Sequence, residues 1–254
     1  MSAAAPVPAT PPPTSSVEVR GIGRHDAIRA DRWTVRGTSK VARDVAAREV
    51  DLDGTVTVGG ALRSDGGSFE GVLEVTGPID IAGALHGRGD LRSGGAVHAG
   101  ELELRGRLLA PVGVTVDRRL CATGWVRAGS IAGGTVELEG MVQVPGSIRG
   151  ASVELRLHTG SRVGAVEGGS ARVSAPTATL VDRVFGRHPS AHVERIEANS
   201  VELEGVDVAF VRAKEVTLGR GSHVTTLEGT VVRRHPTSRL GPESRSPPPY
   251  GLRR

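Results

Sequence analysis

The most regular set of chemically active side chains in this sequence is a series of glutamates. Each is the second residue of an apolar–x–apolar–x–Gly pentad or of a near copy of one. Stacked carboxylates could bind calcium or a polysaccharide, but the outer face of a repeat also needs polar residues simply to be solvated. Because arginines lie two positions further along several pentads, where they can neutralise these carboxylates, we expect a solvated face rather than a site. The glutamates are Glu74, Glu103, Glu137, Glu154 and Glu202, and the arginines are Arg20, Arg36, Arg105 and Arg156.

Other catalytic or metal-binding patterns are not found. The lysines, Lys40 and Lys214, do not follow a glycine run that could cradle a phosphate. The eight histidines are dispersed, and the closest pair, His188 and His192, has a proline between them. The single cysteine, Cys121, excludes an intramolecular disulfide and is expected to be a tolerated outward residue. We therefore expect no enzyme, no cofactor and no metal site.

The glutamates belong to a repeat whose clearest copy is Val136-Glu137-Leu138-Glu139-Gly140. The glycines that end the first copies, Gly21, Gly37 and Gly54, are almost evenly spaced, and a longer step then leads to Gly77. A degraded copy ends at Gly94, and the short step from there to Gly106 is interpreted as compensating for the long one. The stretch from Leu157 to Gly205 is counted as three further periods. A fixed period near 17 predicts a solenoid. Near copies of the pentad occupy residues 17–21, 33–37, 50–54, 73–77, 102–106, 120–124 and 201–205.

Each repeat contains three short apolar patches separated by glycine-rich corners. Val56 and Val58 follow Gly54 at offsets two and four, and Leu62 follows it at offset eight. The alternation within a patch indicates a strand, and strands this short must stack on neighbouring turns to bury their apolar face. We therefore predict an all-β fold, a three-sided parallel β-helix with turns about 4.8 Å apart. It is expected to be right-handed, because parallel crossovers nearly always are.

The repeat predicts one elongated domain over residues 17–232, with about thirteen turns and five inward positions per turn. Residues 1–16 are rich in Pro and Ala, residues 233–254 are rich in Arg and Pro, and both are expected to be disordered tails. Residues 38–50 are assigned to a weaker turn. The repeat is hardest to recognise in residues 158–192. At a register slip near His98, Val97 is expected to point inward instead of the histidine. No signal peptide or membrane-spanning segment is recognised, so a cytoplasmic protein is expected.

The glycine-punctuated turns resemble those of the bactofilins, the bacterial polymer-forming cytoskeletal proteins. Residues 73–83 and 136–146 fit the form apolar-x-apolar-x-Gly-x-x-x-apolar-x-Gly, and residues 196–204 and 216–221 resemble the closing turns of that family. The resemblance implies a right-handed β-helix that assembles end to end, without nucleotide, into filaments that scaffold envelope-associated proteins. The short membrane-targeting peptide at the start of some members is not recognised in residues 1–16, so membrane attachment of that kind is not expected.

Open strand edges at the two tips of a β-helix independently favour end-to-end assembly. The chain itself is therefore the first expected partner, joined head to head or head to tail. The basic tail could touch an anionic membrane surface, whereas the scarcity of aromatic residues argues against nucleic acid. Candidate tip residues are Val17, Val19, Val216, Leu218 and Leu227, and candidate tail contacts are Arg233, Arg234, Arg239, Arg245, Arg253 and Arg254.

Two other functions stay open at this point. A monomeric β-solenoid module that binds proteins would show the same low-complexity repeats. A β-helix acyltransferase is less favoured, because such enzymes have a six-residue repeat, whereas six-residue spacings occur only once per turn in this sequence. A polysaccharide-active enzyme is less favoured, because no secretion signal and no cluster of site residues are recognised.

Overall fold

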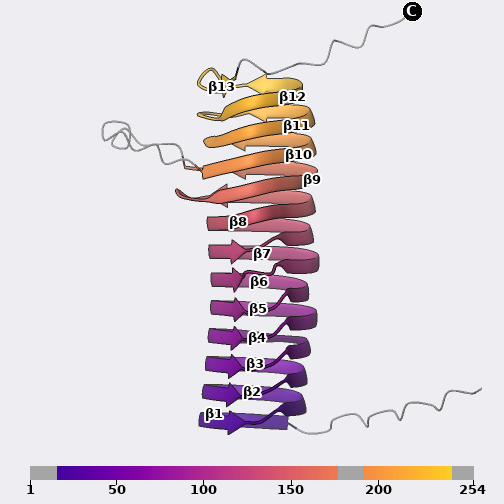
Figure 1. Ribbon diagram of the computed structural model, residues 1–254, viewed down its shortest axis with the longest axis vertical. Helices are drawn as coiled ribbons and strands as arrows, with labels where there is room; N and C mark the ends of the chain where they lie inside the picture. The colour runs from indigo at the N-terminus through magenta and orange to yellow at the C-terminus, as the bar shows by residue number, and fades with distance from the viewer. Residues whose placement is uncertain (1–15, 177–190, 242–254) are drawn as a thin grey trace, which may run out of the picture.

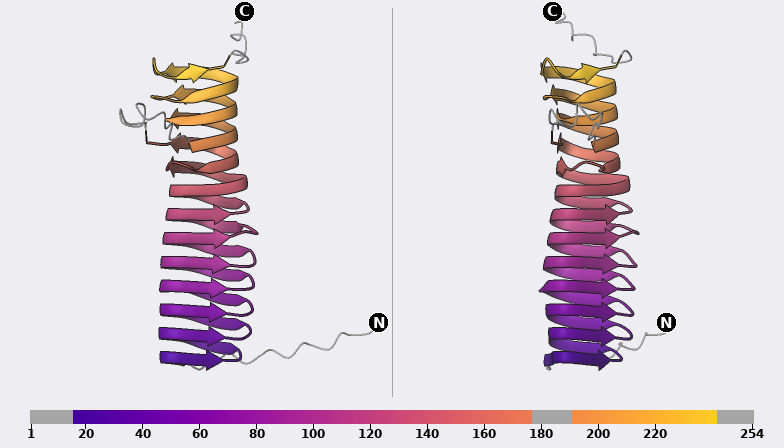
Figure 2. Two further views of the ribbon diagram at one scale, coloured as in Figure 1. Left: turned by 60° about the vertical axis from the view of Figure 1, so that its left-hand side comes forward. Right: turned by 90° about the vertical axis from the view of Figure 1, so that its left-hand side faces the viewer.

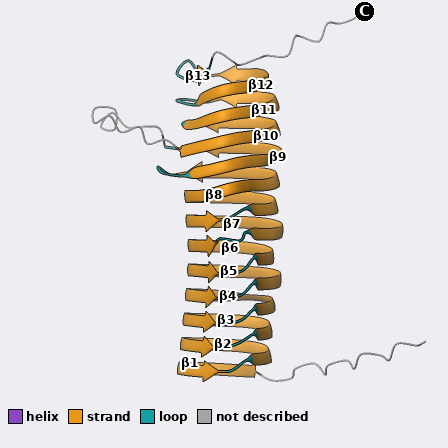
Figure 3. Cartoon of the chain, viewed as in Figure 1, coloured by secondary structure: helices purple, strands orange, loops and turns teal. Residues whose placement is uncertain are grey.

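The computed structural model describes residues 16–176 and 191–241, which form a tall column of stacked strands (Figure 1). The column is a parallel β-solenoid of about 12 turns. Each strand pairs with the next along the chain, in the order β1 to β13. No helix occurs within the described ranges (Figure 3). The strands are β1 (Ser16–His25), β2 (Ile28–Val41), β3 (Val45–Val58), β4 (Leu62–Val75), β5 (Ile79–Ser93), β6 (Val97–Ala110), β7 (Val114–Ala128), β8 (Ile131–Leu157), β9 (Arg162–Ser174), β10 (Ala191–Glu204), β11 (Val206–Leu218), β12 (His223–Arg234) and β13 (Arg239–Leu240).

Each turn has three short sides, as the sequence predicts. In β3 the buried positions come in three pairs, and charged, small or glycine residues separate one pair from the next. The chain bends at these separations, which lets each side bury alternate residues against the turns above and below it. A regular turn thus has six inward positions rather than the five expected. The three pairs in β3 are Val45 with Ala47, Val50 with Leu52, and Val56 with Val58.

We call the side with Val50 and Leu52 the first side and the side with Val56 and Val58 the second side. The corner that ends the first side is a column of glycines with an even spacing. Gly54 pairs with Gly71, Gly71 with Gly89, and Gly89 with Gly106. The long step to Gly77 and the short step from Gly94 that the sequence predicts are therefore wrong. They arise because Leu73 stacks on Val56 in the second side, where the same apolar alternation imitates the pentad of the first.

Glycine is required at this corner by both conformation and space. Gly106 has a φ of 137°, and a Cβ built on it would lie 2.2 Å from the carbonyl oxygen of Gly89. A side chain there would be strained by its backbone angles and would also collide with the turn below.

Large and small residues compensate one another between turns inside the column. Phe69 is 4% exposed, and its ring lies where a Cβ of Gly87, on the next turn, would otherwise be. Such compensation preserves close packing in a narrow interior. It also explains why the pentads of β4 and β5 are hard to recognise, since an inward position of β5 is a glycine.

The turns become shorter toward the C-terminal end. Val193 of β10 pairs with Val208 of β11, and this step along the chain is shorter than the one from Val35 of β2 to Leu52 of β3. Between β9 and β10 the step is far longer, from Val163 to Val193. The three periods counted between Leu157 and Gly205 are therefore wrong, because part of this length belongs to residues 177–190, which lie outside the described residues.

Several local predictions are confirmed or corrected. Residues 38–50 belong to the solenoid as expected, and Val97 is buried while His98 points outward. The repeat extends beyond the expected boundary at Val232, because β12 continues to Arg234 and Leu240 in β13 stacks on Val224. Of the two predicted tails, only Ser16 and residues 233–241 are among the described residues, and 1–15 and 242–254 lie outside them.

Candidate assembly ends and flanks

The N-terminal end of the column is a strand with one unpaired edge. β1 pairs with β2 alone, so within the described part of the chain its other edge faces no strand. Val17 is partly exposed and Val19 is 6% exposed, and the structure places both in this terminal strand as expected. Ile22, at the first glycine corner, is 84% exposed. Sequence reasoning missed Ile22, although the pattern places it directly after the pentad glycine.

The same end contains a polar atom without a partner. His25 occupies a position that stacks on the buried Val41 of the next turn. Its Nε2 atom is buried and makes no hydrogen bond to any described residue. Gly23 provides the space, since a Cβ there would lie 3.2 Å from that nitrogen. A group on a second copy stacked against β1 would supply such a partner.

The C-terminal end differs from the one expected. Val216 and Leu218 are fully buried, because Val231 and Arg234 of β12 stack on them, so their assignment to the tip is wrong. The sequence pattern places most of β12 inside the repeat but ends it at Val232, because Arg233 and Arg234 interrupt the apolar alternation where Arg234 pairs with Leu218. Leu227, 2% exposed, lies within β12.

Three of the candidate tail arginines belong to these last strands. Arg233 and Arg234 end β12 and Arg239 begins β13, whereas Arg245, Arg253 and Arg254 lie outside the described residues. Arg234 Nη2 donates to the carbonyl of Ser238 at 3.3 Å. This end is therefore cationic, with Val232 65% exposed beside the arginines.

The predicted row of glutamates is real, with one exception. Glu103 and Glu137 both pair with Cys121, and Glu154 and Glu202 both pair with Arg172, so these four occupy one side. Glu74 stacks instead between Thr57 and Arg92 on the second side, and its assignment to the row is wrong for the reason given for Leu73.

Arginines neutralise the row as expected. Arg156 lies 2.9 Å from Glu154, and Arg105 lies 3.6 Å from Glu103. The other two predicted arginines pair elsewhere, Arg20 with Glu18 at 2.7 Å and Arg36 with Asp51 and Asp53 at 3.6 Å each. No group of three possible metal ligands forms among the residues that the structure describes.

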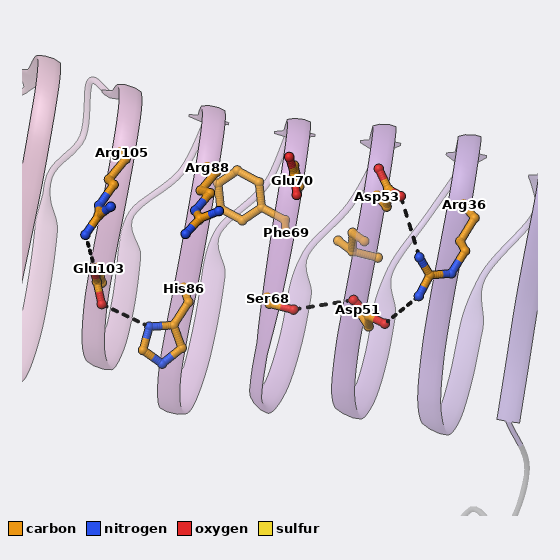
Figure 4. A pocket seen from close by; sticks show the side chains of 12 residues that line it. Arg36, Asp51, Asp53, Ser68, Phe69, Glu70, His86, Arg88, Glu103 and Arg105 are labelled. Atoms are coloured by element: carbon orange, nitrogen blue, oxygen red, sulfur yellow. Dashed lines mark hydrogen bonds and ion pairs between the residues drawn. The ribbon is translucent and has the colours of Figure 1, made fainter.

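A shallow groove lies on this side across β2 to β6, with Phe69 in its floor (Figure 4). Ser68 and His86 are neighbours in register, as a nucleophile and a base could be. The Ser68 hydroxyl faces Asp51 at 3.4 Å, and His86 Nδ1 faces Glu103 at 3.4 Å in the opposite direction. The serine is therefore not hydrogen-bonded to the histidine, and the groove holds exposed ion pairs instead of an activated nucleophile. These residues stand a whole turn apart in sequence, so only the register brings them together.

Two side chains considered from sequence have structural roles. Burial, followed by the charge of Glu137, raises the pKa of the partly exposed Cys121 thiol, which lowers its reactivity at neutral pH. His98 bridges three turns, with Nδ1 3.2 Å from Asp80 and Nε2 3.2 Å from Asp117. Hydrogen bonds to Asp80 and then Asp117 raise the pKa of His98, so the imidazolium acts as a clamp.

Comparison of the chain with protein-family models, curated proteins and solved structures gives no match. Within the described ranges, no helix is long and apolar enough to cross a bilayer. The geometry thus defines a β-solenoid protein, a fold suited to binding or scaffolding.

Proposed function

We propose that this chain is a bactofilin-like structural protein that assembles end to end into filaments without nucleotide. The observation that carries the proposal is the N-terminal end of the column, where β1 has an edge that no strand of residues 16–176 or 191–241 pairs with, together with exposed Ile22 and partly exposed Val17. A strand edge of this kind is a template for pairing with another chain. The unpartnered Nε2 of His25 adds a polar group that a second copy could satisfy.

Assembly of this kind propagates because the two ends of one column are different surfaces. The N-terminal end has exposed Ile22 and partly exposed Val17 beside an edge that no described strand pairs with, and the C-terminal end carries Arg233, Arg234 and Arg239. Contacts at both ends leave every added subunit with a free end, so growth does not close into a ring. The filament would act as a scaffold for envelope-associated proteins in the cytoplasm, near the inner face of the membrane, and not as an enzyme.

The second candidate is a monomeric protein-binding module. It is favoured by the flanks of the column, whose regular rows of charges provide a rigid docking surface. In that case the ends would stay unjoined and the charged rows would contact a different protein.

Electron microscopy of the purified full-length chain, with and without added nucleotide, separates the two candidates. The proposal predicts unbranched filaments in both conditions. Twelve turns at about 4.8 Å each give a rod of roughly 60 Å, so a uniform population of rods of that length would overturn it in favour of the module.

A further inference from the structure

One flank of the column, over four consecutive turns, contains arginines but no carboxylate. It comprises the second side and the following corner, where the loops between successive strands lie one above another along an edge of the column (Figure 2). We call it the arginine–apolar flank. It consists of residues 107–113, 125–130, 141–147 and 162–165, and no Asp or Glu occurs in any of these segments.

The outward side chains of this flank form two adjacent rows. Arg107 pairs in register with Trp125, and Trp125 with Met141. In the second row Leu109 pairs with Arg127, and the row continues through Gln143 to Arg162. The inward neighbours Leu108, Val126 and Val142 are at most 1% exposed, so the alternation directs the two rows outward.

Apolar side chains stand between the arginines on this surface. The Arg107 guanidinium lies over the Trp125 ring, 5.2 Å from its centroid. Met141 is 38% exposed, and Val112, in the adjoining loop, is 59% exposed. Cations and large apolar groups therefore lie next to one another on this side of the column.

The other two flanks of the same turns are neutralised. Arg118 lies 2.8 Å from Glu101, and Arg149 lies 2.9 Å from Glu167. On the arginine–apolar flank, Arg107 reaches Asp90 only at 3.5 Å, and Arg92 holds the same carboxylate at 3.1 Å. Arg127 and Arg162 form no ion pair with any described residue.

We propose that the arginine–apolar flank docks on an anionic lipid bilayer, with the column lying along the surface. Tryptophan favours the boundary between lipid headgroups and acyl chains, and unpaired arginines near an anionic leaflet are attracted to it. A surface with Trp125, Met141 and Val112 among cations can enter this boundary to a shallow depth. Nucleic acid fits less well, because Trp125 is the sole aromatic residue of the flank and Arg107 already covers one of its faces.

Docking by the flank is separate from joining by the ends, so either proposal can fail alone. Three arginines per chain, of which Arg107 is already paired with Asp90, give weak attachment on their own. Repetition of the flank along a filament would strengthen the attachment through many simultaneous contacts.

Co-sedimentation of the full-length chain with vesicles tests the proposal. We expect binding to vesicles that contain phosphatidylglycerol and much weaker binding to pure phosphatidylcholine. The triple variant Arg107→Glu, Arg127→Glu, Arg162→Glu should lower the partition coefficient at least about tenfold, because each arginine contributes near the surface. The matched control is Arg29→Glu, Arg63→Glu, Arg88→Glu, which makes the same charge change at exposed positions on the other flanks and should bind more than the flank variant.

Folding and assembly are measured on the same samples. Circular dichroism and the unfolding midpoint establish that both triple variants fold, and sedimentation without lipid records assembly. Binding that persists in the flank variant, or that falls equally in the control, would overturn the proposal. So would binding that disappears only when Arg245, Arg253 and Arg254 are changed to Gln, since the tail would then be the lipid contact.

Tryptophan fluorescence provides an independent measurement. Trp33 is buried in the column and Trp125 is partly exposed, so brominated lipids should quench Trp125 selectively. The quenching should disappear in Trp125→Leu. Equal quenching in that variant, or none in the wild-type chain bound to vesicles, would contradict insertion of this flank, as would binding to acidic peptide or nucleic acid without binding to vesicles.

Discussion

A turn in the middle of the column and the turn at its N-terminal end have the same pattern but different surroundings. β6 pairs with β5 on one edge and β7 on the other, and its inward Leu102, the register equivalent of Val17, is 1% exposed. β1 pairs with β2 alone, and its inward Val17 remains partly exposed. In a solenoid each turn is stabilised by its neighbours, so substitutions in the middle should affect stability, whereas those at the end should affect what the molecule joins.

The largest expected effect comes from the packing of Phe69 in the middle turns. Phe69→Ala would leave a cavity beside Gly87 and should lower the free energy of unfolding by about 3–5 kcal/mol. Denaturant unfolding monitored by circular dichroism measures the change, with Phe69→Leu as a milder control. A loss below about 1 kcal/mol would mean that the ring does not fill the space left by Gly87.

The glycine corner offers a direct comparison of middle and end. Gly106→Ala combines a strained φ with a collision against the Gly89 carbonyl, and should cost at least about 1–3 kcal/mol. Gly21→Ala changes the same column at the end, where φ is 79° and a Cβ meets nothing within 4 Å. It should cost less than Gly106→Ala in the same unfolding experiment. Equal losses would contradict the role assigned to the neighbouring turn.

The smallest expected effect on stability comes from the His98 clamp in the middle turns. Because the pKa of His98 is raised in the folded protein, its stabilisation is fully present below the unfolded value near pH 6.5 and is lost as pH rises through the folded pKa. Since the ring is 45% exposed, the contribution is of order 0.2–1 kcal/mol. Unfolding midpoints at pH 5.5 and pH 8.5 should therefore differ more for the wild-type chain than for His98→Gln. The same pH dependence in both proteins would contradict the clamp.

The period, the alternation and the glycine corners are sufficient to predict the parallel solenoid. They are not sufficient to assign each pentad to a side, because all three sides bury alternate residues and Leu73 therefore imitates the first side. The pentads of β4 and β5 are hidden because Phe69 and Gly87 exchange volume across turns. The C-terminal end is assigned too early, because Arg234 covers Leu218 where the pattern requires an apolar residue.

The surfaces available for function are harder to predict than the fold. Ion pairs such as those of His98 join side chains on successive turns, so the exact register is needed to find them. The same holds for the arginine–apolar flank, whose rows become visible only when residues from four turns are aligned. Composition reports the number of arginines but not which of them lack a partner.

The most direct test of the central claim compares the lengths of assemblies formed by end and middle variants in electron micrographs. Val17→Glu combined with Ile22→Glu adds charge to the N-terminal end, and Val112→Glu makes a similar change at an exposed apolar residue in the middle. We predict that the wild-type chain and the Val112 variant form filaments, while the end variant stays folded, as circular dichroism would show, and gives only short particles. Filaments of unchanged length in the folded end variant would contradict assembly through this end.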